Sequence, residues 1–131
     1  MKINWTQNEE IGDPMIQKSS KNTRFHFLNT NGISLANDNL EITMFRETML
    51  EYNMDYMGLI EINLDTTNHK VKKRITEETK KRINQISVQS TSSNKPMENF
   101  YKPGGVYSIC QGDFLTQKKS EGKDHMGGWV Y

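Results

Sequence analysis

The segment Tyr56-Met57-Gly58-Leu59-Ile60 is a short apolar run, and it ends at a carboxylate, Glu61. A run of this length and composition predicts a buried β-strand. Upstream, residues 24–28 (Arg-Phe-His-Phe-Leu) alternate around aromatic residues and predict a first strand. That strand is expected to stop at Asn29-Thr30-Asn31-Gly32, because Asn and Gly tolerate the left-handed backbone of loops.

A helix is expected between these two strands. Ile42, Phe45, Met49 and Tyr52 recur at the spacing of one helical face, and Asp38 or Asn39 can cap its start. Strand, helix and strand in this order predict a right-handed crossover between two parallel strands. The expected fold class is therefore α/β, with a mixed β-sheet and flanking helices on one face.

The remaining chain predicts one more helix and more strands. Residues 65–68 are rich in cap formers, and a second helix is expected to run on as far as Ile86. Its periodic positions are poorly apolar, so we expect it to pack at a rim. Further strands are expected at residues 87–91, 106–110 and 129–131, with turns at 101–105 and 111–113 and a polar loop at 118–122.

Length and composition indicate one domain preceded by a tail. The chain has 131 residues, 34% of them hydrophobic, and a mean hydropathy of -0.81. Residues 1–23 are polar and contain Asp13-Pro14, which breaks any regular period. We expect residues 1–23 to be a flexible N-terminal segment and residues 24–131 to form the domain.

Cys110 is the one cysteine, so there is no disulfide framework and no cysteine pair to chelate a metal. This favours an intracellular setting, in the nucleus or the cytoplasm. The N-terminus has no apolar core of a signal peptide, and no apolar stretch reaches 18 residues, so neither secretion nor a membrane span is expected. Cys110 lies in an apolar run and is expected to be a small core residue.

The net charge is +1, but basic residues gather in one stretch between residues 70 and 82, which contains two acidic residues, Glu77 and Glu78. Such a stretch is either a solvated helix face or a surface for a phosphate backbone. Tyr101 and Lys102, in a loop, are candidates for nucleic-acid contact. Most of the aromatic residues are expected in the core, namely Phe25, Phe27, Phe45, Tyr107 and Trp129.

Polar side chains follow the two expected parallel strands at the point where each ends. Asn29 and Asn31 follow the first, and Glu61 follows the second. Ligands bind at the carboxyl edge of open α/β sheets, and such oxygen ligands suit Mg²⁺ or, alternatively, Mn²⁺. The pattern by itself is also compatible with simple turn chemistry at the asparagines and a helix cap at Glu61.

Four short blocks, in order, resemble the endonuclease/exonuclease/phosphatase (DNase I-like) superfamily. Residues 27–33 (Phe-Leu-Asn-Thr-Asn-Gly-Ile) are similar to its first strand and loop, and residues 55–61 (Asp-Tyr-Met-Gly-Leu-Ile-Glu) to its metal-binding block. Residues 101–106 (Tyr-Lys-Pro-Gly-Gly-Val) and 124–131 (Asp-His-Met-Gly-Gly-Trp-Val-Tyr) look like segments of the branch carried by non-LTR retrotransposons. The resemblance covers roughly residues 24–131.

This resemblance implies a function and a larger architecture. Glu61 would coordinate the catalytic Mg²⁺, Asn31 and Asn29 would support the metal and orient the scissile phosphate, and DNA would be the partner. The fold would be the N-terminal half of a four-layer α/β sandwich. Asn31 stands where the family often has Asp, so this position brings no negative charge to the metal.

The family's later Asp-x-Asn and Ser-Asp-His blocks do not follow within the sequence, and we expect the chain to be inactive by itself, with the remainder of its domain missing after Tyr131. Asp124-His125 comes too early to replace the catalytic histidine. A non-catalytic nucleic-acid- or protein-binding α/β module is the alternative, and an unrelated small α/β domain is a third reading.

Overall fold

The computed structural model describes residues 18–83, 86–93, 101–128 and 130. Within these ranges the regular elements follow one another as β1 (Phe25–Asn29), α1 (Leu40–Glu51), β2 (Tyr56–Ile60), α2 (His69–Lys80), β3 (Ile86–Thr91) and β4 (Val106–Gln111). Two short 3-10 helices, η1 (Asn37–Asn39) and η2 (Gly112–Gln117), precede α1 and follow β4.

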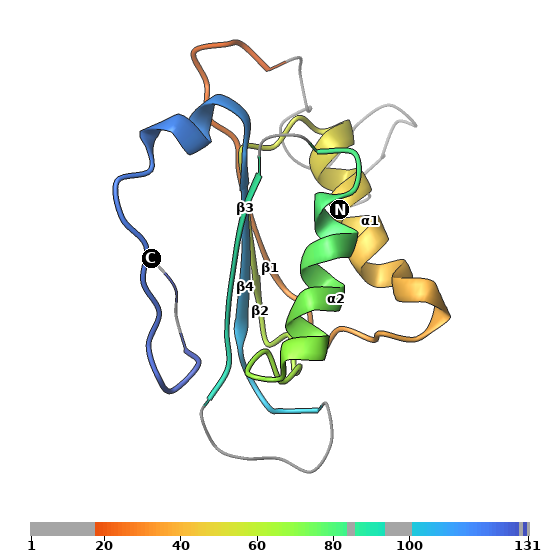
Figure 1. Cartoon of the computed structure of the whole chain (residues 1–131). Helices are drawn as coiled ribbons and strands as arrows, with labels where there is room; N and C mark the ends of the chain where they lie inside the picture. Colours follow the sequence, from red (N-terminus) through yellow and green to blue (C-terminus); the bar gives the residue numbers. More distant parts are fainter. Residues whose placement is uncertain (1–17, 84–85, 94–100, 129, 131) are drawn as a thin grey trace, which may run out of the picture.

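The four strands form one mixed sheet in the order β1-β2-β4-β3. β1 and β2 are parallel neighbours, as the sequence predicted, whereas β4 runs antiparallel to both β2 and β3. Both helices cover one face of this sheet, and the segment from η2 onward lies on the other side (Figure 1). The predicted α/β class with a mixed sheet and helices on one face is therefore confirmed.

The core lies between the sheet and the helices. Met57 and Leu59 of β2 face the helices, and their partners in β4, Ile109 and Tyr107, lie on the same face of the sheet. Strand side chains alternate between faces, so this register leaves Tyr56, Gly58 and Ile60 on the opposite face. Buried residues of both helices complete the same cluster, among them Ile42, Met49, Val71 and Ile75.

Helix α1 begins at Leu40, as expected, but the predicted side-chain cap does not form. Asn39 occupies the N-cap with a left-handed backbone (φ 62°), and its side chain does not cap the helix. Its amide oxygen instead accepts a hydrogen bond from Arg74 of α2. The predicted face holds in part, since Ile42 and Met49 are buried while Tyr52 is 38% exposed.

Helix α2 was predicted correctly at its start and wrongly at its end. The Asn68 side chain accepts hydrogen bonds from the backbone N–H groups of Lys70 and Val71, which satisfies the first turn. The helix stops at Lys80, Arg82 has a left-handed backbone (φ 66°), and Ile86 already belongs to β3.

The expectation that α2 packs at a rim was also wrong. Val71, Ile75 and Thr79 are all buried. The Thr79 hydroxyl lies 2.5 Å from the Tyr107 hydroxyl, and Tyr107 in turn lies on the central strand β4. A polar threonine can occupy this core position because its hydroxyl also donates to the Ile75 carbonyl (2.7 Å). Burial raises the pKa of Tyr107 well above its ordinary value, so this hydroxyl stays protonated.

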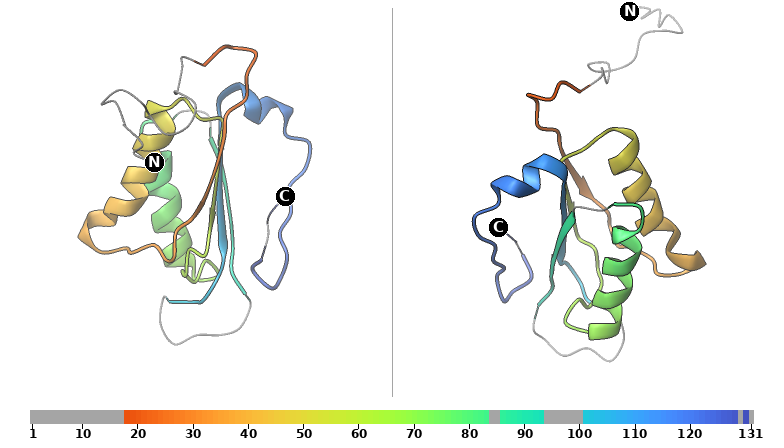
Figure 2. Two further views of the ribbon diagram at one scale, coloured as in Figure 1. Left: turned by 180° about the vertical axis from the view of Figure 1, so that it is seen from behind. Right: turned by 45° about the horizontal axis from the view of Figure 1, so that its top comes forward.

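The face of the sheet away from the helices is aromatic and partly open. Phe25 and Phe27, expected in the core, are 52% and 70% exposed, because the β1 register places them opposite Tyr56 and Gly58. Phe25 packs edge-on against Phe114 of η2, with ring centroids 5.3 Å apart. The C-terminal segment runs along this side of the sheet (Figure 2). Cys110 lies on the same face and is only half-buried, which corrects its assignment to the core.

The chain ends were predicted less completely. Residues 1–17, Trp129 and Tyr131 lie outside the described residues, so the strand expected at 129–131 is represented by Val130, which forms an isolated bridge with Lys123. Residues 18–23 have no helix or strand, and Lys18 forms an ion pair with Asp55. The turn expected at residues 111–113 is in fact the start of η2. No helix in the described part of the chain has the length and apolarity to cross a bilayer.

We expect Met49→Ala to lower the free energy of unfolding by about 2–5 kcal/mol, because it removes a fully buried core side chain of α1 and leaves a cavity. Met44→Ala in the same helix, where the side chain is 58% exposed, should change it by less than about 0.5 kcal/mol. Urea unfolding followed by circular dichroism measures both. Equal losses in the two variants would contradict the described orientation of α1.

Candidate functional site at the carboxyl edge of the parallel strands

The loops that leave β1 and β2 remain hydrogen-bonded to each other beyond the ends of the strands. Thr30 N–H donates to the Ile60 carbonyl (3.0 Å), Gly32 N–H to the Glu61 carbonyl (2.7 Å), and Ile33 N–H to the Ile62 carbonyl (2.9 Å). The Thr30 hydroxyl adds bonds to the carbonyls of Ile60 and Glu61 at 3.1 and 3.0 Å. The backbone therefore holds residues 29–33 against residues 60–62.

Asn29 at the end of β1, and Asn31 and Glu61 in the two adjacent loops, thus lie at one edge of the sheet, and all three are exposed to solvent. The Asn29 side-chain oxygen accepts the Asn31 backbone N–H at 2.9 Å, which leaves one of its lone pairs for another donor or an ion. Asn31 and Glu61 both have left-handed backbones, with φ of 50° and 53°. This conformation is uncommon for a glutamate, and such outliers are found preferentially at functional sites.

The chemistry of this donor set fits a hard divalent cation bound through few protein ligands. It offers one carboxylate and two amide oxygens, which leaves positions for water and phosphate oxygens. Within the described residues no three His, Cys, Asp or Glu side chains gather where they could hold a metal. Of the three candidate ligands, Glu61 is the one that would bring negative charge to a metal at this edge.

Asn63 is a structural residue of this edge that the sequence reasoning missed. Its side-chain oxygen accepts the Gly104 N–H at 2.8 Å, and its own backbone N–H donates to the Gly104 carbonyl at 2.8 Å. A Cβ added to Gly32 would lie 3.3 Å from the Asn63 amide nitrogen, so glycine lets the first loop approach closely. Asn63 thereby joins the two parallel-strand loops to the turn that precedes β4, and an Asn two residues after Glu61 was the available signal.

Lys102 was one of two candidates for nucleic-acid contact from a loop, and its burial argues against that role. It is 1% exposed and forms an ion pair with Asp65 at 2.8 Å. Its ammonium also donates to the Ser93 carbonyl at 2.7 Å and lies 3.4 Å from the Thr67 hydroxyl. Three acceptors satisfy its three hydrogens, as the burial of a charge requires. Tyr101 remains 54% exposed, in agreement with its expected loop position.

The Asp65 carboxyl stays ionised in this buried position. Burial alone would raise its pKa, but hydrogen bonds from Lys102 and Thr67 outweigh that effect, and the pKa lies below its ordinary value. The ion pair connects the loop after β2 with the turn before β4. It therefore stiffens the edge of the sheet on which Glu61 lies.

Much of the basic stretch is engaged in contacts between and around the helices. Arg46 of α1 is buried and donates to the Glu78 carbonyl at 2.7 Å, and Arg82 pairs with Glu47 at 2.7 Å. Arg74 donates to Asn39 and to the Leu35 carbonyl. These contacts hold α2 against α1 and the loop before it.

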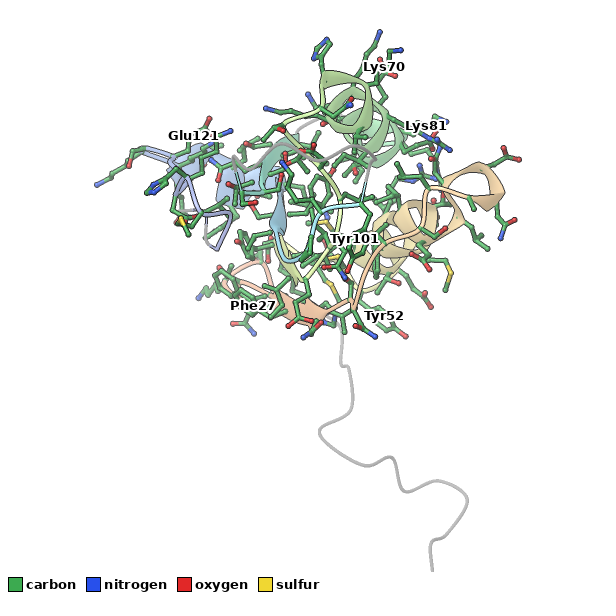
Figure 3. The ribbon with its side chains drawn as sticks, turned by 90° about the horizontal axis from the view of Figure 1, so that it is seen from below. Phe27, Tyr52, Lys70, Lys81, Tyr101 and Glu121 are labelled. Carbon is green, nitrogen blue, oxygen red and sulfur yellow. The ribbon has the colours of Figure 1, made fainter. Side chains whose placement is uncertain are left out.

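Other cations of the stretch project into solvent. Lys70 and Lys80 are exposed and have no ion-pair partner within the described ranges. In Figure 3, Lys70 lies at the outer side of α2, on the opposite side of the molecule from Phe27. The basic surface and the open aromatic face are therefore separate surfaces.

Comparisons of the chain with protein-family models, with curated proteins and with solved structures gave no match.

We expect Asp65→Asn to destabilise the protein by roughly 3 kcal/mol at neutral pH, because it leaves the buried Lys102 ammonium unpaired. The difference from the wild type should shrink as the pH falls below about 3.8, the ordinary value for aspartate, since the depressed pKa of Asp65 contributes stability only while the carboxyl is ionised.

Denaturant unfolding at several pH values measures this difference. Asp113→Asn, at an exposed position in η2, is the matched control and should change stability by less than about 0.5 kcal/mol. A penalty for Asp65→Asn that stays constant down to pH 2 would show that the ion pair contributes nothing as a charge pair.

Proposed function

We propose that this chain is part of a magnesium-dependent phosphodiesterase that acts on DNA, of the endonuclease/exonuclease/phosphatase type found in non-LTR retrotransposons. The observation that carries the proposal is the juxtaposition of Glu61 with Asn29 and Asn31 at the carboxyl edge of two parallel strands. Ligand sites of open α/β sheets are found at this edge.

Glu61 is the residue that would hold Mg²⁺, with Asn31 and Asn29 as the next ligands or as donors to the phosphate. When bound, the ion would polarise a phosphoryl oxygen and lower the pKa of a coordinated water. The asparagine amide N–H groups can donate to phosphate oxygens, and the amide oxygens would be available as ligands to the cation. The hydrogen bonds between the two loops hold next to each other the backbone segments that carry these groups.

The open aromatic face supports the larger architecture that we propose, a four-layer sandwich in which a second sheet covers the first. Phe25, Phe27 and Ile60 are between 45% and 70% exposed on this face. Packing of a second sheet about 10 Å away would bury these side chains in a shared core. The catalytic base and histidine of such an enzyme would then come from the second half.

A non-catalytic nucleic-acid-binding module is the competing function, and the exposed lysines of α2 favour it. Lys70 and Lys80 could neutralise two backbone phosphates without disturbing the contacts between the helices. If binding depends on these phosphate contacts alone, Lys70→Gln/Lys80→Gln should weaken binding to a DNA duplex and reduce the salt slope by about 2. Fluorescence anisotropy at several salt concentrations measures this, and a salt slope that stays unchanged would rule out Lys70 and Lys80 as phosphate contacts.

The proposed metal site is tested with Glu61→Gln. Mn²⁺, as a paramagnetic substitute for Mg²⁺, should broaden the amide NMR signals of residues 29–33 and 61 in the wild-type chain. The variant should require at least about tenfold more Mn²⁺, equivalent to about 1.4 kcal/mol, because the one carboxylate of the site has been neutralised.

Glu51→Gln is the matched control, since Glu51 is exposed at the end of α1 and distant in sequence from both loops. A plasmid-nicking assay with Mg²⁺ accompanies the binding experiment. Any nicking activity of the wild type should be lost in Glu61→Gln and kept in Glu51→Gln. Equal Mn²⁺ broadening in both variants and the wild type would contradict the proposed metal site.

A further inference from the structure

A cavity lies along the edge of β3, formed by residues that the proposed metal site does not use. It has a volume of about 170 Å³ and is lined by the loop after β2, the end of β3 and the C-terminal segment, through Thr66, Thr67, Thr91, Ser92, Lys123, Asp124 and His125. Four of these seven residues carry hydroxyl groups. The cavity is thus small and rich in hydrogen-bonding groups.

The hydroxyls of Thr66 and Ser92 leave one hydrogen without an acceptor. Both residues are more than nine-tenths buried, at 6% and 3% exposure. Their oxygens are 3.0 Å apart, and the Ser92 oxygen also accepts the Thr66 backbone N–H at 2.9 Å. Whichever hydroxyl donates to the other, the second hydroxyl hydrogen has no acceptor within the described residues. Each hydroxyl oxygen has a partner in the other, and the remaining hydrogen is available to an acceptor that enters the cavity.

The other groups around the cavity are a lysine, a histidine and polar groups that already have hydrogen-bond partners. Lys123 and His125 are exposed at its mouth, and Lys123 has no ion-pair partner in the described part of the chain. The Thr91 hydroxyl donates to the Asp124 carbonyl at 3.1 Å. The Asp124 carboxylate accepts the backbone N–H groups of Met126 and Gly128 at 3.2 and 2.8 Å. Both oxygens of the Asp124 carboxylate therefore accept hydrogen bonds from the backbone of the turn that follows Asp124.

The C-terminal segment packs closely against the residues that follow β3, and this contact forms one wall of the cavity. A Cβ added to Gly127 would lie 2.4 Å from the backbone nitrogen of Ser93 and 2.5 Å from the Ser92 carbonyl carbon. Only glycine permits this approach, which brings Lys123 and His125 next to the Thr66–Ser92 pair. The buried Lys102–Asp65 ion pair supports the same loop from behind.

We propose that this cavity binds a phosphate group, through the spare hydroxyl hydrogen, the Lys123 ammonium and a His125 ring N–H. Phosphate oxygens accept several hydrogen bonds at once, and the bond from an ammonium is the stronger, charge-assisted kind. The site does not depend on a metal at Glu61. The phosphate comes either from a nucleic-acid backbone or from free inorganic phosphate.

The test is a titration of the full chain with inorganic phosphate at constant ionic strength, followed by amide NMR shifts. The amides of Thr66, Ser92 and residues 123–125 should shift in a saturable manner. Lys123→Gln and His125→Gln should each raise the phosphate Kd at least fivefold, about 1 kcal/mol. Lys119→Gln is the matched control, an exposed lysine of the same segment outside the cavity, and should bind phosphate as the wild type does.

A second titration with a dinucleoside monophosphate distinguishes the two sources of phosphate. Saturable shifts of the same amides by both probes would identify a phosphodiester site, whereas shifts by inorganic phosphate alone would identify free phosphate as the ligand. The proposal is overturned if inorganic phosphate leaves these amides unshifted, or if Lys123→Gln binds it as tightly as the wild type. Neither result bears on Mn²⁺ binding at Glu61, so the two proposals can fail separately.

Discussion

The parallel pairing of β1 with β2, and its continuation into the loops that follow, is the constraint on which the rest of this edge depends. Parallel strands deliver their carboxyl ends to the same side of a sheet. Here the backbone bonds from Thr30, Gly32 and Ile33 extend that pairing by several residues. Because each loop satisfies the other's polar groups, neither needs regular structure to be held in place, and Glu61 can keep a left-handed backbone at the surface.

A buried polar network supports this edge from below. Asn63 joins the loop after β2 to the turn before β4, and the Lys102–Asp65 pair joins the same two segments a few residues further on. A buried ion pair adds little net stability, since desolvation offsets most of the attraction. Its contribution is geometric, because removing either partner leaves a charge that the interior cannot solvate.

The two faces of the sheet differ in how completely they are covered. The helix face is filled with aliphatic side chains and closed by the Thr79–Tyr107 contact, so it forms a complete core. The other face carries Phe25 and Phe27 largely exposed, and the C-terminal segment covers it only in part. Exposed aromatic surface of this kind is typical of an interaction surface in soluble proteins. It lies opposite the lysines of α2, so a partner on one surface would leave the other accessible.

The sequence by itself determined the order and kind of the elements from β1 to β4, because strand and helix periodicity are local signals. It also located the asparagine loop and Glu61 at the ends of adjacent parallel strands, since polar residues that interrupt an apolar run are visible without a structure. Prediction from the sequence failed where one local pattern is compatible with two different tertiary arrangements. The alternation around Phe25 and Phe27 is the same whichever face they occupy, and only the pairing register with β2 put them on the open face.

Lys102 and Asn39 fall in the same category. A lysine beside Pro-Gly-Gly is predicted to be a solvated loop residue, and an Asn before a helix is predicted to cap it. Their actual partners, Asp65 and Arg74, lie 37 and 35 residues away in the chain. Contacts at such separations leave no periodic trace, because their energy depends on which groups are desolvated together after the layers have packed. Only the tertiary structure could therefore decide which polar residues hold the edge together and which ones remain free to bind.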